Sequence, residues 1–210
     1  DWMNYVRQLA SAELATQARM GGAGDEIQVD ETLLRGRRKS NRGRTLRGDN
    51  LPRSRNYGDK DDRGPWVVGM VSSTSRELRM RIVDRRDART LGSLIRRNVA
   101  PHSTVASDEW RGYRCVQYLR ESNGAHMHLR HVTVNHSVNF VCPVTGTNTQ
   151  RIESLWASVK HQIMRRRKGT SRTLLQGHLD WLWWQSLNGP RRCQDPFLRL
   201  VDLIAKHYPQ

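Results

Sequence analysis

The sequence predicts an α/β domain in which helices flank a mixed β-sheet, with a helical extension at the C-terminal end. Short β-prone runs separated by turn residues recur between residues 26 and 134. A helical pattern at 88–99 ends before Pro101, and a further strand-like run follows at once, as in a βαβ unit. Helical periodicity then dominates from residue 151 onward.

The charge balance indicates a polyanionic partner. Lys and Arg number 36 against 20 Asp and Glu in 210 residues, which gives a formal net charge of +16, and Arg greatly outnumbers Lys. Arginine pairs with phosphate through a planar fork of donors, so nucleic acid is the simplest partner. A basic protein that is merely soluble is the alternative.

Cysteine usage and hydropathy restrict the class of protein further. Cys115, Cys142 and Cys193 are widely spaced and form no C-x-x-C pair. They support neither a disulfide framework nor a zinc finger, and they fit a reducing compartment. No apolar run approaches the roughly 20 residues needed to cross a bilayer, so we expect no membrane partner.

The first predicted element is a helix over residues 2–19, with apolar residues spaced by three and four. The glycine-rich segment 20–24 ends it. We expect residues 1–20 to be the end of an upstream region that is missing from the sequence. Residues 26–31 then predict a strand in which Ile27 and Val29 face one way, and Gln28 and Asp30 the other.

Residues 34–63 form a basic stretch in which arginines alternate with Gly, Asn and Ser. It predicts a flexible loop that contacts phosphates, and an ordinary solvated insertion is the alternative. A second basic run, at 165–168, would extend a DNA-binding face, or serve as a nuclear localisation signal or a solvated helix end. The candidate DNA-binding residues are Arg37, Arg38, Lys39, Arg42, Arg44, Arg165, Arg166, Arg167 and Lys168.

The other elements follow from periodicity and turn residues. Strands at 66–71 and 78–83 flank a turn at 72–76, and a helix at 88–99 precedes the strand that leads to Asp108. On the closing helices, Trp181, Trp183 and Trp184 are expected to be core rather than to stack on bases. The elements predicted after Asp108 are a helix up to Leu119, a strand at 126–134, and helices at 151–164, 173–184 and 196–207.

Three acidic residues stand where these elements can bring them together. Asp30 lies on the first strand, Asp108 ends the fourth, and Glu153 lies on the first turn of the 151–164 helix. The first and fourth strands of a mixed sheet can be neighbours, and a helix packed on the sheet can carry Glu153 to them. Such carboxylates repel one another unless divalent cations lie between them, and oxygen ligands suit Mg²⁺ or Mn²⁺. Two such ions can activate water or a 3′-hydroxyl against a phosphodiester.

Spacing alone leaves alternatives to these three acids. Glu31 and Glu109 directly follow the two aspartates and compete with them, although strand alternation would turn them to the other face. An acid at the position of Glu153 is also favoured by the helix dipole without any catalytic role.

Four histidines lie close together, three of them within the predicted 126–134 strand and one just after it. A strand would divide them between two faces, and no cysteine lies nearby, so the pattern does not favour a zinc site. They are His126, His128, His131 and His136.

Seven short blocks follow one another along the chain: 27–32 (IQVDET), 38–44 (RKSNRGR), 66–69 (WVVG), 82–85 (IVDR), 107–113 (SDEWRGY), 134–140 (VNHSVNF) and 149–156 (TQRIESLW). In this order, they resemble the DDE transposases of Merlin-type DNA transposons and of related bacterial insertion sequences (ISXO2-like transposase domain). The resemblance runs from about residue 21 to residue 184. It implies an RNase H-like fold and metal-dependent cut-and-paste transposition.

The resemblance also implies roles for single residues. Asp30, Asp108 and Glu153 match the catalytic, metal-binding acids, with Mg²⁺ as the cofactor and Mn²⁺ as an alternative. Relatives vary at the third acid, so Asn148 and Gln150 compete with Glu153. The implied partners are transposon ends and target DNA, and the pairing of two ends suggests a homodimer.

Three departures from the family pattern affect these expectations. An insertion at about 46–63 lengthens the basic loop, and Asn148 stands where a His is common. Both differences leave the acids intact. The sequence carries no amino-terminal DNA-binding module, which puts independent recognition of transposon ends in doubt.

We therefore expect a DDE transposase catalytic domain over residues 21–185, with a basic insertion at about 35–63 and a helical tail over 186–210. One alternative is a domesticated descendant that binds DNA without cutting it. Another is a structure-selective nuclease of the same fold, which would cut DNA and never join it. The protein would act in the nucleus if it is eukaryotic and in the cytoplasm if it is bacterial, and we favour the nucleus.

Overall fold

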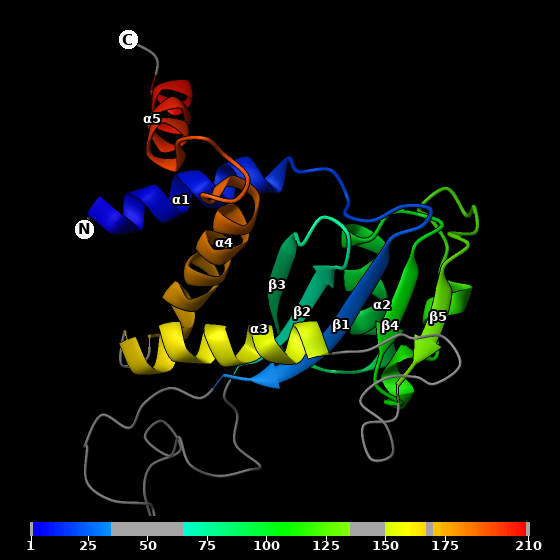
Figure 1. The fold of residues 1–210 in the computed structure, drawn as a ribbon. Coiled ribbons are helices and arrows are strands. Elements are labelled where there is room, and N and C mark those ends of the chain that lie inside the picture. The colour runs from blue at the N-terminus through cyan, green and yellow to red at the C-terminus, as the bar shows by residue number, and fades with distance from the viewer. Residues whose placement is uncertain (1, 35–64, 135–149, 167–169, 209–210) are drawn as a thin grey trace, which may run out of the picture.

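A single mixed sheet lies at the centre of the described structure (Figure 1). The computed structural model describes residues 2–34, 65–134, 150–166 and 170–208. Within these ranges, the strand order is β3-β2-β1-β4-β5. The strands are β1 (Glu26–Leu33), β2 (Trp66–Ser72), β3 (Leu78–Val83), β4 (Thr104–Ser107) and β5 (Arg130–Thr133).

The pairing of the strands confirms the predicted fold class. Strand β2 pairs antiparallel with both β1 and β3, whereas β4 pairs parallel with both β1 and β5. Helix α2 (Ala88–Asn98) makes the crossover that leads from β3 to β4. Three antiparallel strands followed by two parallel strands, flanked by helices, are the sheet of the RNase H-like fold.

Helix α2 covers one face of the sheet. Asp87 caps its first turn, because its carboxylate accepts hydrogen bonds from the backbone nitrogen and the hydroxyl of Thr90, at 2.9 and 2.8 Å. Leu91 and Ile95 are fully buried in a core shared with β1, β2 and β4. The apolar residues of β1 that enter this core are Ile27 and Val29, as strand alternation predicts.

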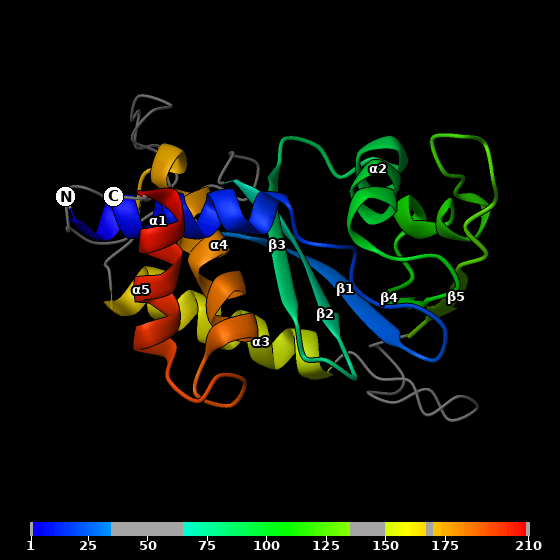
Figure 2. The same cartoon turned by 90° about the horizontal axis from the view of Figure 1, so that it is seen from above.

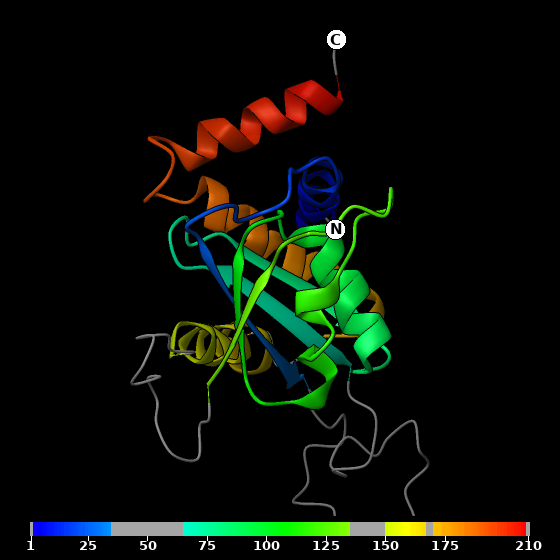
Figure 3. The ribbon, with the colours of Figure 1, turned by 90° about the vertical axis from the view of Figure 1, so that its right-hand side faces the viewer.

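Helix α3 (Gln150–Lys160) covers the opposite face, and it continues into the π-helical segment η4 (His161–Arg166). Ile152, Trp156 and Val159 of α3 enter a second core with Val67 and Val71 of β2. The sheet therefore lies between α2 and α3, as Figures 2 and 3 show.

Three more helices form a separate group beside the β3 edge: α1 (Trp2–Ala15), α4 (Arg172–Asn188) and α5 (Pro196–His207). Helix α4 packs on both β3 and α1, and α5 packs on α1. Trp183 and Trp184 are buried in this region together with Leu14 and Leu203. They are core residues, as expected. No helix in the described part of the chain combines the length and the apolar character that a membrane span requires.

Two segments differ from the sequence prediction. In place of a helix up to Leu119, the chain forms two short 3₁₀ segments, η2 (Arg111–Tyr113) and η3 (Val116–Tyr118). A side chain at Gly112 would lie 2.7 Å from the Trp110 ring, so the chain turns tightly there. Strand β5 is shorter than the predicted 126–134, because its neighbour β4 offers only four residues for pairing.

Candidate active site

Asp30 lies in the middle of β1, on the face that α3 covers. Its cross-strand partner on β2 is Gly69. The indole nitrogen of Trp156 donates a hydrogen bond to Asp30 Oδ2 at 2.9 Å. A Cβ atom at Gly69 would lie 2.7 Å from the Trp156 ring, so the missing side chain creates the space for this ring on the sheet. The half-buried Asp30 carboxylate is therefore oriented by a residue from helix α3.

Asp108 directly follows β4, the strand that pairs parallel with β1. The register places Ile27 beside Val105 and Gln28 beside Ala106. This register continues along β1 toward Asp30 and along β4 toward Asp108, which comes just beyond the end of the strand. The backbone nitrogen of Trp110 donates to Asp108 Oδ1 at 3.1 Å. The turn itself therefore holds this carboxylate.

Glu31 lies on the opposite face of β1 and has other partners. The Tyr113 hydroxyl donates to Glu31 Oε2, and an Arg86 guanidinium nitrogen lies 3.4 Å from Glu31 Oε1. Burial raises the pKa of the Glu31 carboxyl, and repulsion from Asp108 and Asp30 raises it further, against the lowering effects of Tyr113 and Arg86.

Glu153 lies on the first turn of α3, exposed to solvent. It precedes Trp156 by three residues, or about 4.5 Å along the helix axis. The backbone nitrogen of Ile152 donates to the side-chain oxygen of Gln28 at 3.2 Å, and this contact fixes the start of α3 against β1. Gln150, a competitor for the third acid, is the first residue of the helix and is exposed.

The structure thus places Asp30 on β1, Asp108 just after the neighbouring strand β4, and Glu153 on the helix that covers the Asp30 face, but it does not bring them into a closed ligand set. Across the described ranges, no three His, Cys, Asp or Glu side chains are grouped so that they could hold a metal ion. Asp30 lies on β1 and Asp108 directly follows the neighbouring strand β4, whereas Glu153 lies on helix α3. Their carboxylate oxygens, two of the three groups half-buried, are the donors that Mg²⁺ and Mn²⁺ prefer. The donor chemistry therefore fits these cations.

A contact behind Asp108 was not predicted from the sequence. Ser107 Oγ lies 2.9 Å from His131 Nε2 on β5 and 2.8 Å from the backbone oxygen of Asp108. Burial lowers the pKa of His131. The rings of His126 and His128, in the same part of the sequence, lie 4.8 Å apart. His131 is therefore engaged with β4.

Trp156 is a further site residue that the sequence did not reveal. Its spacing placed it in the apolar stripe of the helix, which is correct, because the residue is 5% exposed. A buried indole nitrogen usually needs an acceptor, and this was the signal that could have pointed to Asp30.

Other predicted site residues cannot be placed. Of Arg165 and Arg166, which end η4, only the backbone is described. Asn148 and His136 lie outside the described residues, as do the remaining candidate DNA-binding residues: Arg37, Arg38, Lys39, Arg42, Arg44, Arg167 and Lys168.

The chain is similar to known proteins in sequence and in structure. Residues 22–186 match a family model described as the ISXO2-like transposase domain. No curated protein matches the chain. The catalytic core domain of BIV integrase aligns with a TM-score of 0.45 and 13% identity, over 87% of this chain and 97% of that chain.

A second solved structure is the intasome of simian T-cell lymphotropic virus in complex with PP2A regulatory subunit B56 gamma. A chain of it aligns with a TM-score of 0.45 and 10% identity, over 82% of the present chain. The alignment covers 51% of that chain, so the present chain spans about half of its length.

Proposed function

This chain belongs to the family of ISXO2-like transposase domains, and from that premise we propose that it cuts DNA at transposon ends and joins the freed 3′-hydroxyl to target DNA. The observation that carries the proposal is the parallel pairing of β1, which holds Asp30, with β4, which leads directly into Asp108. Helix α3, which brings Glu153, reaches Asp30 through Trp156.

In this proposal, Asp30, Asp108 and Glu153 hold two Mg²⁺ ions, with Mn²⁺ as an alternative. Such ions, when bound, lower the pKa of water or a 3′-hydroxyl and stabilise the leaving oxygen of a phosphodiester. The other residues orient the acids. Trp156 fixes one oxygen of Asp30, and the backbone nitrogen of Trp110 fixes one oxygen of Asp108.

Both proposed reactions are displacements at phosphorus. In cutting, a water oxygen forms the new bond to phosphorus, the bond to the 3′-oxygen breaks, and that oxygen gains a proton. In joining, the 3′-hydroxyl oxygen of the cut end forms the new bond to a phosphorus of the target and gives up its proton. The bond from that phosphorus to its own 3′-oxygen breaks, and this leaving oxygen gains a proton. The number of phosphodiester bonds is unchanged in the second reaction, so it needs no external energy source.

The formal net charge of +16 supports DNA as the partner. We assign phosphate contacts to the basic residues at 37–44 and 165–168, which include neither Asp nor Glu. Because two transposon ends must be cut together, a homodimer in a paired-end complex is part of the proposal. If the source is eukaryotic, the proposed site of action is the nucleus.

The test uses a duplex carrying the terminal repeats that flank the coding sequence in its source genome, a target plasmid and Mg²⁺. We expect cut and joined products from the parent chain, and neither product from Asp30→Asn, Asp108→Asn or Glu153→Gln. Asp202→Asn is the matched control, because Asp202 is an exposed acid on α5.

Each outcome has a stated meaning. Undiminished activity in Asp108→Asn would overturn the assignment of the acids. Cut DNA without joined DNA would indicate a nuclease of the same fold. DNA binding without any product that depends on Mg²⁺ would indicate a domesticated DNA-binding protein.

A further inference from the structure

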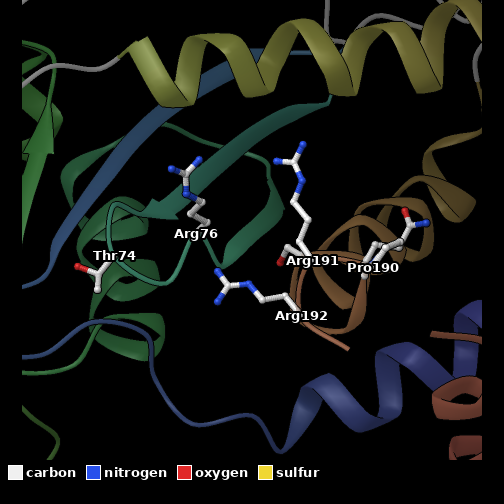
Figure 4. A pocket seen from close by; sticks show the side chains of 8 residues that line it. Thr74, Arg76, Pro190, Arg191 and Arg192 are labelled. Carbon is white, nitrogen blue, oxygen red and sulfur yellow. The ribbon is translucent and has the colours of Figure 1, made fainter. Parts of the chain in front are cut away.

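An arginine-lined pocket of about 730 Å³ lies between the β2–β3 turn and the connection from α4 to α5. Its eight lining residues include Arg76, Arg191 and Arg192, and none of them is acidic. Figure 4 shows the three guanidinium groups entering the same space from two sides, below helix α3. The pocket is thus a cationic hollow built from two segments that are far apart in the sequence.

One wall of the pocket is the β2–β3 turn, which hydrogen bonds to Asp25, the residue before β1, hold in place. Ser72 Oγ donates to Asp25 Oδ2 at 2.6 Å, and the backbone nitrogen of Thr74 donates to Asp25 Oδ1 at 3.1 Å. Arg76 has a φ of 56°, in the left-handed region that Gly or Asn adopts more readily. An arginine therefore occupies a turn position whose backbone does not favour it.

The other wall is the connection after α4. A Cβ atom at Gly189 would lie 2.6 Å from the backbone oxygen of Gln185, so only glycine allows this close turn. The Gly189 oxygen then accepts hydrogen bonds from the backbone nitrogens of Arg192 and Cys193, at 2.8 and 3.0 Å. These bonds fix the backbone from which Arg191 and Arg192 project.

The two walls are joined to each other, so the pocket exists before any ligand binds. The backbone nitrogen of Leu78 donates to Ser186 Oγ at 3.0 Å, and Trp183 Nε1 donates to Glu77 Oε1 at 3.0 Å. Glu77 is also paired with Arg79 at 2.7 Å and is buried. The acid of this turn is therefore already neutralised.

The charge of the pocket indicates an anionic occupant. In the part of the chain that the structure describes, no carboxylate pairs with Arg76, Arg191 or Arg192, although other exposed arginines such as Arg85 do form ion pairs. Guanidinium groups bind phosphate through paired donors, and three of them suit an oxyanion with several acceptor oxygens.

The position of the pocket relates it to the candidate active site. Arg151 on the first turn of α3 donates from its side chain to the backbone oxygen of Ser73, which precedes the pocket residue Thr74. Glu153 follows Arg151 by two residues. A polyanion that enters the pocket is thus brought to the end of α3 that carries the third acid.

We propose that this pocket binds a phosphate group of the DNA backbone and holds the duplex beside the start of helix α3. The proposal rests on the proposed function, because it takes DNA as the partner and gives it a contact point outside the two basic segments at 37–44 and 165–168. A long polyanion is preferred over a free phosphate ion, because the whole chain carries a formal net charge of +16.

The experiment compares two triple variants of the full chain. The pocket variant is Arg76→Gln, Arg191→Gln and Arg192→Gln. The control variant is Arg97→Gln, Arg114→Gln and Arg130→Gln, which removes the same charge from exposed arginines on α2, after η2 and on β5. Binding to a labelled duplex is measured by fluorescence anisotropy between about 50 and 200 mM NaCl.

For the pocket variant, we expect the slope of log Kd against log salt to fall by about one to two, because one or two phosphate contacts are lost. We expect the control variant to keep the slope of the parent. An unchanged slope in the pocket variant, or an equal fall in both variants, would contradict the proposal. All six arginines are exposed, so loss of folding is not expected, and single variants such as Arg192→Gln serve if a triple variant does not fold.

Cutting and joining of DNA are measured on the same proteins. If the parent chain cuts no DNA, and the slope of log Kd against log salt is still lower for the pocket variant than for the parent, the proposed function is refuted and the pocket is supported. If the parent chain cuts DNA and the pocket variant keeps the slope of the parent, only the proposal that the pocket binds DNA is refuted.

Discussion

Trp156 of helix α3 donates its indole hydrogen to the carboxylate of Asp30 on strand β1, with 2.9 Å between Nε1 and Oδ2. The two residues belong to different layers of the fold. This one bond therefore couples the position of the helix that carries Glu153 to the orientation of an acid on the sheet. Groups that hydrogen-bond metal-binding residues orient them, and their loss commonly lowers metal affinity or activity by about 10- to 100-fold.

The first prediction concerns this donor. Trp156→Phe keeps an aromatic side chain on α3 but removes the indole donor to Asp30, together with the outer ring atoms that lie over Gly69. We expect Mg²⁺-dependent cutting to fall about 10- to 100-fold, with a higher Mg²⁺ concentration needed for half-maximal activity. Trp184→Phe is the matched control, since it removes an indole bond to Glu13 of 2.8 Å outside the site. Equal losses in both variants would mean that Trp156 acts only through stability.

The second prediction concerns the space under α3. In Gly69→Ala, the added methyl group would lie 2.7 Å from the Trp156 ring and 3.2 Å from Ile152. We expect the free energy of unfolding to drop by about 1–3 kcal/mol because the helix must shift, and cutting to drop with it. Chemical denaturation measures the first effect.

Gly177→Ala is the control for Gly69→Ala. Its added methyl group would meet Arg7 at 3.9 Å, an ordinary contact, inside helix α4. There, alanine should raise stability by about 0.5–1 kcal/mol, because glycine is the poorer helix former. If Gly69→Ala were as stable and as active as the parent, Trp156 would not need the space that glycine leaves.

The third prediction concerns Tyr113 and Glu31. Tyr113→Phe leaves the Glu31 carboxyl on the buried face without its hydroxyl donor. We expect a loss of about 1–3 kcal/mol in the free energy of unfolding at neutral pH, the cost of an unsatisfied buried polar group. Urea denaturation of both proteins across pH measures it.

The sign of the pH dependence follows from the raised pKa of Glu31. A carboxyl whose pKa is higher in the folded state destabilises the fold as pH rises through that value. Loss of Tyr113, whose bond lowers the Glu31 pKa, should raise the pKa further. The gap in stability between parent and variant should therefore widen with rising pH. A gap that narrows would mean that Glu31 is not the group affected.

The fourth prediction concerns His131, whose pKa is lowered by burial. A histidine with a depressed folded-state pKa favours the fold when it is neutral, and it destabilises the fold as pH falls. We expect stability to decline as pH falls below about 6.5, the usual histidine pKa, through the lower folded value. His131→Gln should lose less stability over this range than the parent does. His161→Gln, at an exposed position on η4, should behave as the parent, and an equal change in both would refute the assignment to His131.

Much of the fold was predictable, because local patterns report local structure. The spans of β1, β2, β3 and the main helices follow from alternation and helical periodicity. The sequence allowed the first and fourth strands to be neighbours, and the parallel pairing of β1 with β4 shows that they are. The prediction of a helix up to Leu119 was wrong. The chain forms 3₁₀ segments there, with Gly112 packed closely against the Trp110 ring.

Spacing and alternation depend only on neighbours in the chain, so the order of residues was enough to predict a strand at Asp30, a strand that leads to Asp108 and a helix at Glu153. Three contacts arise from the tertiary structure alone: the bond from Trp156 to Asp30, the bond from Tyr113 to Glu31, and the pocket shared by Arg76 and Arg192. Each of these pairs joins residues distant in sequence. Strand register and helix packing bring these residues together, and neither of the two can be read from the periodicity of the sequence.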